Sequence, residues 1–229
     1  MARRIDTRAV AAVIAAAIAI AGSAFAGVAF GDVLVYVNNL ASAKDGKELS
    51  HFEGKAADCA RHVRGGSLLI QVTGKDTCGY RLPVEGDKPQ PDHAVHARVK
   101  LDKQTPKELR SKTFLGVAVR YGGGTGYTLR ILPKRHQFKL RRLPNGTGFP
   151  ASGKSHAIKA TNKWNDLRLE AFGTHVTAVV NGKTIADVDD SDAKEIKGRK
   201  AEVFAGANKA NKIGAFARVD DVRLTVPSP

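Results

Sequence analysis

The sequence is short of cysteine, of helical periodicity and of linker-like segments. Only two of its 229 residues are cysteines, and they lack the CxxC spacing that is typical of redox motifs and metal-binding pairs. After the first 30 residues, no proline-rich or serine-rich linker, low-complexity block or internal repeat divides the chain. We therefore expect one domain over residues 32–229, which is long enough to bury a hydrophobic core.

Residues 1–30 have the features of a targeting or anchoring segment. Three arginines among the first eight residues precede an uncharged run, rich in alanine, valine and isoleucine, over residues 9–30. As a signal peptide, the segment has an apolar stretch and a small-residue cleavage site that ends at Ala26. As a membrane anchor, the same run is long enough to cross a bilayer as one transmembrane helix, with the arginines in the cytoplasm. Both interpretations place the domain outside the cytoplasm, either secreted or anchored to the cell membrane.

Cysteine usage agrees with export. Cys59 and Cys78 bracket a strand-like run over residues 67–72, and a disulfide bond between them is the simplest interpretation. Closing a loop of this length would stabilise the fold by ~3 kcal/mol, because it restricts the unfolded chain.

Alternating apolar and polar residues dominate the exported part. In the stretch between Trp164 and Val188, Asn181-Gly182 separates two alternating runs, and both residues tolerate the positive φ angles of a type I′ hairpin turn. Only residues 105–111 and 192–199 look briefly helical. The pattern predicts an all-β, antiparallel sandwich or barrel. The strand-like segments are 33–37, 94–101, 114–121, 127–132, 137–140, 167–171, 176–180 and 221–226.

Three segments, in order, resemble the concanavalin A-like lectin/glucanase superfamily. Residues 116–121 match a G-x-x-x-R-Y strand, residues 164–170 match W-N-x-L-R-x-E with an N-G-K hairpin after it, and residues 213–224 resemble a closing F-D-D-V-x-V strand. Within the superfamily, the sequence is most similar to the laminin G-like and keto-disaccharide hydrolase-like domains. The resemblance implies a two-sheet jelly-roll β-sandwich over residues 32–229, with a concave face that binds glycans in many relatives.

The same resemblance directs attention to carboxylates. Glucanases of the superfamily carry two glutamates on one strand, in an E-x-D-x-E type arrangement, as nucleophile and acid/base. This chain has no such run, Glu170 is alone on its strand-like segment, and the opening segment 33–40 lacks the N-G-x-x-L-x-G-W wording of hydrolase-like relatives. These departures favour a non-catalytic binding domain for glycan or an anionic cell-envelope polymer. The alternative is a keto-disaccharide hydrolase-like enzyme that cleaves glycosides.

Three aromatic residues are candidates for contact with a sugar. Trp164 is the only tryptophan, and its place at the start of a strand suits the edge of the core better than a sugar platform. Tyr121 and Tyr127 flank the glycine-rich turn 122–126, where they could either contact a ligand or pack in the core.

Metal-binding patterns are weak. His93 and His96 are three residues apart in a strand-like segment, and this odd spacing sends their side chains to opposite faces. An acidic cluster after the hairpin could hold calcium through oxygen ligands or could be a solvated turn, and it lacks the glycine and distal glutamate of an EF-hand loop. No other cofactor is expected. The cluster consists of Asp187, Asp189, Asp190 and Asp192.

Positive charge points most directly to a partner. The formal net charge is +15, and cleavage after Ala26 would remove three arginines and one aspartate, two net positive charges, to leave +13. Such a field attracts anionic polymers or membrane surfaces with salt-dependent affinity, although a basic strand face can also serve solubility alone. We expect a polysaccharide, an anionic envelope polymer or anionic lipid as partner, and no specific nucleic acid. The densest basic residues are Arg130, Lys134, Arg135, Lys139, Arg141 and Arg142.

Overall fold

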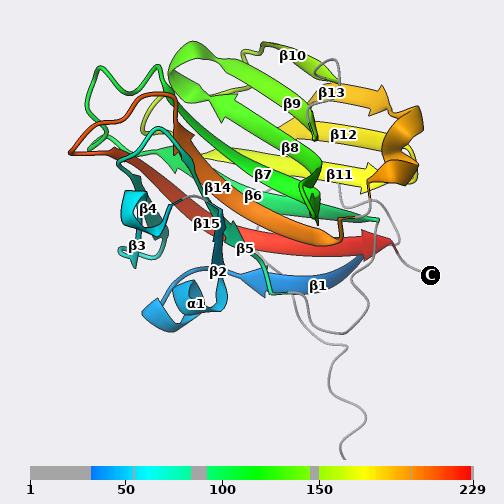
Figure 1. Cartoon of the computed structure of the whole chain (residues 1–229), viewed down its shortest axis with the longest axis horizontal. Helices are drawn as coiled ribbons and strands as arrows, with labels where there is room; N and C mark the ends of the chain where they lie inside the picture. Colours follow the sequence, from blue (N-terminus) through cyan, green and yellow to red (C-terminus); the bar gives the residue numbers. More distant parts are fainter. Residues whose placement is uncertain (1–31, 54, 84–91, 145–149, 197, 228–229) are drawn as a thin grey trace, which may run out of the picture.

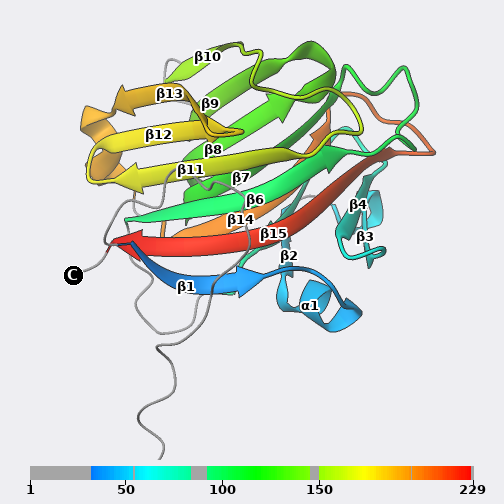
Figure 2. The same ribbon diagram turned by 180° about the vertical axis from the view of Figure 1, so that it is seen from behind.

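The computed structural model describes residues 32–53, 55–83, 92–144, 150–196 and 198–227. Within these ranges the chain forms two antiparallel β-sheets packed face to face, so the predicted all-β sandwich is confirmed. Figure 1 shows one sheet in front of the other, and Figure 2 shows the second sheet from behind. The predicted targeting or anchoring segment lies outside the described residues. Within them, no helix is long and apolar enough to span a membrane.

Sheet A contains eight strands, with the order β13-β12-β11-β6-β15-β4-β3 and with β1 also paired to β15. Strand β15 is long enough to hold two neighbours along one edge, β4 near its start and β1 near its end. The strands are β1 (Asp32–Asn38), β3 (Cys59–Val63), β4 (Leu68–Val72), β6 (His93–Leu101), β11 (Asn165–Phe172), β12 (His175–Val180), β13 (Lys183–Asp189) and β15 (Ala215–Pro227).

Sheet B contains seven strands in the order β10-β9-β8-β7-β14-β5-β2. Its strands are β2 (Ser50–Glu53), β5 (Thr77–Arg81), β7 (Thr113–Gly122), β8 (Thr125–Leu132), β9 (Gln137–Leu143), β10 (Ala151–Lys154) and β14 (Lys200–Ala207). The helical elements are the α-helix α1 (Ala43–Glu48) and the 3-10 helices η1 (Ala56–Asp58), η2 (Pro133–Arg135) and η3 (Ser191–Glu195).

The predicted strands all correspond to strands of the structure, and the predicted hairpin between β12 and β13 is confirmed. Asn181 and Gly182 have φ angles of 50° and 79°, as a type I′ turn requires at both central positions. Of the two segments that look briefly helical, residues 192–199 overlap the short 3-10 helix η3, whereas residues 105–111 contain no helix.

The main core lies between the two sheets. Along each central strand, alternate side chains point inward and are fully buried, as Val95 and Val99 do on β6 and Leu115 and Val117 do on β7. The other side chains of each strand therefore point to an outer face, where a binding site can form without disturbing the core.

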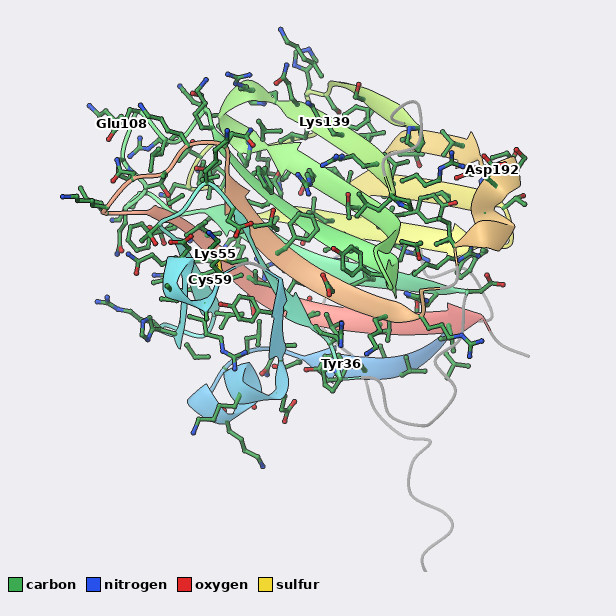
Figure 3. The ribbon with its side chains drawn as sticks, in the orientation of Figure 1. Tyr36, Lys55, Cys59, Glu108, Lys139 and Asp192 are labelled. Atoms are coloured by element: carbon green, nitrogen blue, oxygen red, sulfur yellow. A yellow bond between two sulfur atoms is a disulfide. The ribbon has the colours of Figure 1, made fainter. Side chains whose placement is uncertain are left out.

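Strand β1 departs from this pattern, because most of its apolar side chains are exposed. Val33, Leu34, Val35 and Val37 are 39–56% exposed, whereas Tyr36 packs partly against the core (Figure 3). The strand pairs with β15 on one edge, and no described strand pairs with its other edge. The apolar run 9–30 ends just before this strand in the sequence.

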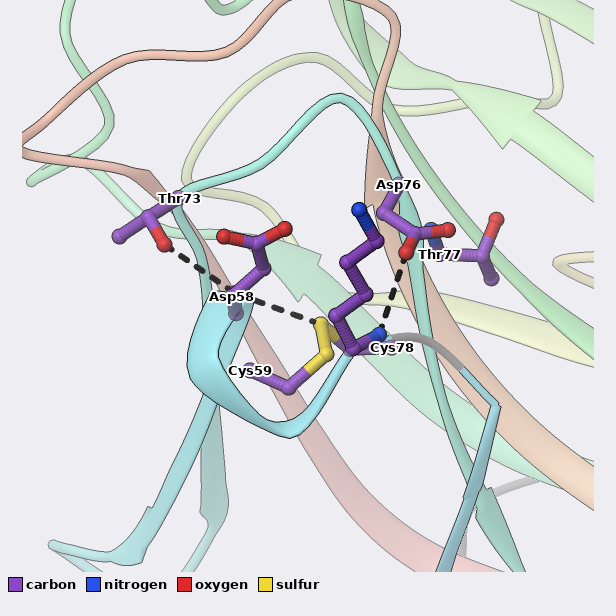
Figure 4. Close-up of a disulfide and its surroundings, with 7 residues drawn as sticks. Asp58, Cys59, Thr73, Asp76, Thr77 and Cys78 are labelled. Carbon is purple, nitrogen blue, oxygen red and sulfur yellow. Dashed lines mark hydrogen bonds between the residues drawn. A yellow bond between two sulfur atoms is a disulfide. The ribbon is translucent and has the colours of Figure 1, made fainter.

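The predicted disulfide is confirmed, and it joins the two sheets. Cys59 begins β3 in sheet A, Cys78 lies on β5 in sheet B, and their Cα atoms are 5.6 Å apart (Figure 4). Beside the bond, the backbone oxygen of Asp58 accepts a hydrogen bond from the Thr73 hydroxyl at 3.3 Å. A bond of this kind is typical of proteins that fold in an oxidising compartment, which agrees with an extracytoplasmic location.

Candidate functional site

The candidate site lies on the outer face of sheet B, the face turned away from sheet A. Along β7, Leu115, Val117 and Val119 belong to the core, so the residues between them point outward. The strand register aligns these outward residues with those of neighbouring strands in rows. One row contains Phe204, Gly116, Arg130 and Lys139, and the next contains Arg81, Glu202, Ala118, Thr128 and Arg141.

Aromatic rings form the floor of this face. The rings of Phe114 and Phe204 meet edge to face, with their centroids 6.4 Å apart. The guanidinium carbon of Arg130 lies 4.6 Å from the Phe114 ring centroid and 5.6 Å from that of Phe204. A Cβ at Gly116 would lie 2.4 Å from the Phe204 ring, so glycine is needed there for the ring to occupy its place. The floor thus holds the Arg130 guanidinium in a defined position.

A pocket of about 270 Å³ opens over this floor. Its lining combines four cations, two amides and two apolar side chains, and it includes no acidic side chain. Positive charges that converge on a partly enclosed surface create a potential that attracts anions. The lining residues are Phe114, Arg130, Leu132, Arg135, Gln137, Lys139, Arg141 and Asn208.

The fold brings together four of the six basic residues singled out in the sequence. Arg130, Arg135, Lys139 and Arg141 line the pocket (Lys139 is labelled in Figure 3). Lys134 is exposed on η2, next to Arg135 but outside the lining.

Arg142 points away from the pocket, because neighbouring residues of a strand face opposite sides. Its guanidinium donates hydrogen bonds to Asp190 and Asp192, each at 2.8 Å, and the carboxylates raise its pKa above the ordinary value, with the Asp192 hydrogen bond as the largest cause. This cluster joins β9 of sheet B to η3 and its N-cap Asp190, which follow the edge strand β13 of sheet A. Arg142 therefore links the sheets instead of facing a ligand.

The two tyrosines do not form an exposed platform. Tyr127 is fully buried in the main core, and its hydroxyl donates a hydrogen bond to Asp190 at 2.7 Å. Burial, followed by this hydrogen bond, raises the pKa of the Tyr127 phenol far above its ordinary value. Tyr121 is 8% exposed and packs with the apolar cluster around Phe114 and Phe204. The sequence leaves open whether these rings contact a ligand or pack inside the protein, and in the structure both rings are packed.

Trp164 lies on the outer face of sheet A. It is half-buried beneath two cations, with the Arg98 guanidinium 5.1 Å and the Lys100 ammonium 4.6 Å from its ring centroid. The sequence predicts that Trp164 packs at the edge of the core. The structure differs, because the cations of the neighbouring strand β6 cover its ring.

The acidic cluster is divided between two basic partners. Asp187 and Asp189 lie 2.6 and 3.1 Å from the two ring nitrogens of His175, whereas Asp190 and Asp192 bind Arg142. The hydrogen bond to Asp189 is the largest cause that raises the pKa of His175. Among the described residues, no group of three or more histidine, cysteine or acidic side chains is arranged to hold a metal ion.

The two histidines of β6 do point to opposite faces, as their spacing predicts. His93 is buried on the core side, where its Nε2 atom accepts a hydrogen bond from the backbone N–H of Arg120 at 3.1 Å. His96 lies on the outer side of sheet A, and burial lowers its pKa.

Sequence reasoning did not single out Glu202 or the phenylalanine floor. Glu202 is fully buried on the outer side of β14, in register with Arg81 on one side and Ala118 on the other. It is the only acidic residue in strands β5, β7, β8, β9, β10 and β14. The alternation over 201–207 could have indicated a strand with Glu202 and Phe204 on one face. The order of strands in the sheet is needed to show which residues lie beside them.

The chain belongs to the 3-keto-alpha-glucoside-1,2-lyase-like domain family, whose sequence pattern matches residues 40–218. No curated protein matches the sequence. The resemblance to keto-disaccharide hydrolase-like domains and to the concanavalin A-like superfamily is thus confirmed.

Solved structures show the same fold at low sequence identity. An endo-1,3-beta-glucanase from Streptomyces sioyaensis is similar with a TM-score of 0.62 and 11% identity, over 87% of this chain and 98% of that chain. The carbohydrate binding module CBM66 from Bacillus subtilis has a TM-score of 0.53 and 14% identity, over 76% and 93%. A protein of unknown function with a galectin-like fold, also from Bacillus subtilis, has a TM-score of 0.59 and 14% identity, over 85% and 97%. These likenesses establish a concanavalin A-like fold and leave the activity open.

Proposed function

We propose that this domain binds an acidic polysaccharide through the outer face of sheet B and does not cleave it. The observation that carries the proposal is the pocket, which gathers four cations and no acidic side chain over an aromatic floor. A carbohydrate binding module among the proteins of similar fold supports a glycan as the ligand. The net charge of +15 supports an anionic one.

The pocket suits a sugar that carries a carboxylate, sulfate or phosphate. The planar guanidinium groups of Arg130 and Arg141 match the two oxygens of such an anion, and charge-assisted hydrogen bonds of this kind are the stronger ones. Phe114 and Leu132 are buried in the floor and support the cations that would contact the sugar. Because two aromatic rings already position Arg130, little side-chain entropy is lost when it binds.

Isothermal titration of the full-length protein tests the proposal. The ligands are polygalacturonate and hyaluronan as acidic polysaccharides, with laminarin and dextran as neutral ones. We expect binding to acidic ligands alone and a large loss in the variant with Lys139→Ser and Arg141→Ser. A matched variant, Lys134→Ser with Lys183→Ser, removes the same charge outside the pocket and is expected to bind like wild type. Binding to the neutral glycans, or unchanged binding in the pocket variant, would contradict the proposal.

The second candidate function is cleavage of a keto-glycoside, which the description of the family suggests. Glycoside hydrolysis by two carboxylates requires a pair about 5–9.5 Å apart. In the central strands of sheet B, Glu202 is the single acid and it is fully buried. We therefore expect no turnover when a 3-keto-disaccharide is incubated with the protein and followed by chromatography. Turnover that disappears in Glu202→Gln and remains in Glu170→Gln would favour the enzyme.

We further propose an extracytoplasmic location, either secreted or anchored by residues 1–30. The disulfide supports it, and the exposed apolar side chains of β1 would lie close to the bilayer if the anchor were retained. Cell fractionation, with N-terminal sequencing of the mature protein, separates the two forms. A cytoplasmic protein with both thiols reduced would contradict either form.

A further inference from the structure

We propose that the pocket is one end of a longer binding track, so that the ligand is a polymer with repeated negative charges. This inference rests on the proposed function, because it extends the same site. From Asn208, at the edge of the pocket, the track crosses three neighbouring loops that carry six exposed lysines, here called the lysine rim. The lysine rim consists of Lys75, Lys103, Lys107, Lys112, Lys209 and Lys212.

Backbone hydrogen bonds hold the three loops beside the pocket. The N–H of Asn208 donates to the carbonyl of Lys112 at 3.0 Å, which ties the end of β14 to the start of β7. The N–H of Asn211 donates to the carbonyl of Thr73 at 2.9 Å and adds the loop between β4 and β5. Lys112 precedes Phe114 of the pocket floor by two residues, a spacing of roughly 7 Å in extended chain. The rim therefore begins where the pocket ends.

The acidic side chains of the same loops mostly have internal partners. Asp76 accepts hydrogen bonds from two backbone N–H groups. Asp102 is buried and forms an ion pair with Arg218. Glu108, labelled in Figure 3, is exposed and accepts a hydrogen bond from Asn211 at 3.4 Å. The outward surface of the loops is consequently basic.

The rim lysines are free to attract an anionic chain. None of them forms an ion pair with another described residue, so their charges repel one another until anions arrive. A sugar with one or two charges can fill the pocket alone. A chain with repeated charges can occupy pocket and rim together, and linked contacts multiply affinity.

The contributions of the track and of the pocket can be measured separately by comparing a short ligand, digalacturonate, with long polygalacturonate. The rim variant combines Lys112→Ser, Lys209→Ser and Lys212→Ser in the full-length protein. A matched control, with Lys44→Ser, Lys47→Ser and Lys183→Ser on α1 and β13, removes the same charge elsewhere. We expect the rim variant to bind long polygalacturonate roughly tenfold or more weakly and digalacturonate like wild type. The control should match wild type with both ligands.

Two outcomes would overturn the inference alone, and a third would refute the proposed function on which it rests. Wild-type affinity of the rim variant for the long chain would remove the track and leave the pocket. Equal loss of both ligands in the rim variant would indicate a general field effect without a track. Failure of wild-type protein to bind either ligand would refute the proposed function itself. Thermal unfolding of each variant ensures that loss of binding is not loss of folding.

Discussion

The outer faces of the two sheets both carry many charged side chains, but they arrange them differently. On sheet A, Arg98 lies 3.5 Å from Asp166 and 3.4 Å from Asp220, and Arg168 lies 2.7 Å from Glu170. On sheet B, the pocket gathers four cations with no acidic residue in its lining. The two faces have the same strand geometry, so the difference arises from which residues occupy the outward positions.

Charge balance distinguishes a structural face from a binding face. An ion pair at a surface contributes little to stability, about 0–1 kcal/mol, but it leaves the face nearly neutral to an approaching ligand. A pocket that gathers like charges attracts an oppositely charged ligand and becomes more stable when that ligand binds.

Charge reversal in the pocket has the largest expected effect. Replacing Lys139→Glu together with Arg141→Glu should weaken binding of polygalacturonate on the order of a hundredfold, because the two introduced negative charges repel the anionic ligand. Reversal of Lys100→Glu with Lys183→Glu on sheet A serves as the control and should change affinity little. Isothermal titration measures both. Equal losses on the two faces would remove the distinction between them.

Gly116→Ala tests the floor beneath the pocket. A Cβ at this position would lie 2.2 Å from the Leu129 carbonyl oxygen and 2.4 Å from the Phe204 ring, so the strand or the ring must move. We expect a loss of roughly 1–3 kcal/mol in the free energy of unfolding and weaker binding, because Arg130 loses its support. Urea unfolding followed by titration checks both effects. A variant as stable as wild type would show that the floor is not tightly packed.

Arg98→Met on sheet A is expected to be mild. The change removes two ion pairs that lie partly in solvent and the contact of the guanidinium with the Trp164 ring, which the apolar methionine side chain can still cover. The free energy of unfolding should fall by at most about 1 kcal/mol, with no change in polygalacturonate affinity. A clear loss of affinity would assign a binding role to sheet A.

The smallest effect concerns pH. The hydrogen bond to Asp189 raises the pKa of His175 above its ordinary value of 6.5. Because the pKa is higher in the folded state, the stability contributed by His175 is complete below 6.5 and is lost as pH rises through the folded value. His175→Gln should remove this part of the pH dependence in urea unfolding between mildly acidic and alkaline pH. An unchanged pH profile would contradict the assignment.

The sequence predicts the disulfide and many of the strands, because alternation and the cysteine pair are local signals, but it does not predict β14 at the centre of sheet B. Part of the site could be predicted as well, since Lys139 and Arg141 are two residues apart and share a face of the strand. Charge density groups Arg142 with them, although strand parity places it on the other face. The same parity places Tyr127 with Leu129 in the core. Charge density alone cannot separate Lys139 and Arg141 from Arg142, because the separation depends on the face of the strand that each residue occupies.

The rest of the site depends on contacts between strands distant in sequence. Phe204 and Phe114 meet because β14 lies beside β7, and Glu202 faces Arg81 because β5 lies on the other side of β14. Strand order is not encoded in the alternation of any one segment. The aromatic floor and the buried carboxylate could therefore be found only in the folded chain.

The most direct test of the account is the salt dependence of polygalacturonate binding. The affinity of the full-length protein is measured from low to high salt, for wild type and for the variant with Lys139→Ser and Arg141→Ser. If the cationic pocket on the outer face of sheet B binds the polymer, wild-type affinity falls steeply with salt and the variant shows weaker binding with a shallower slope. Equal affinities and equal slopes in the two proteins would contradict the central claim.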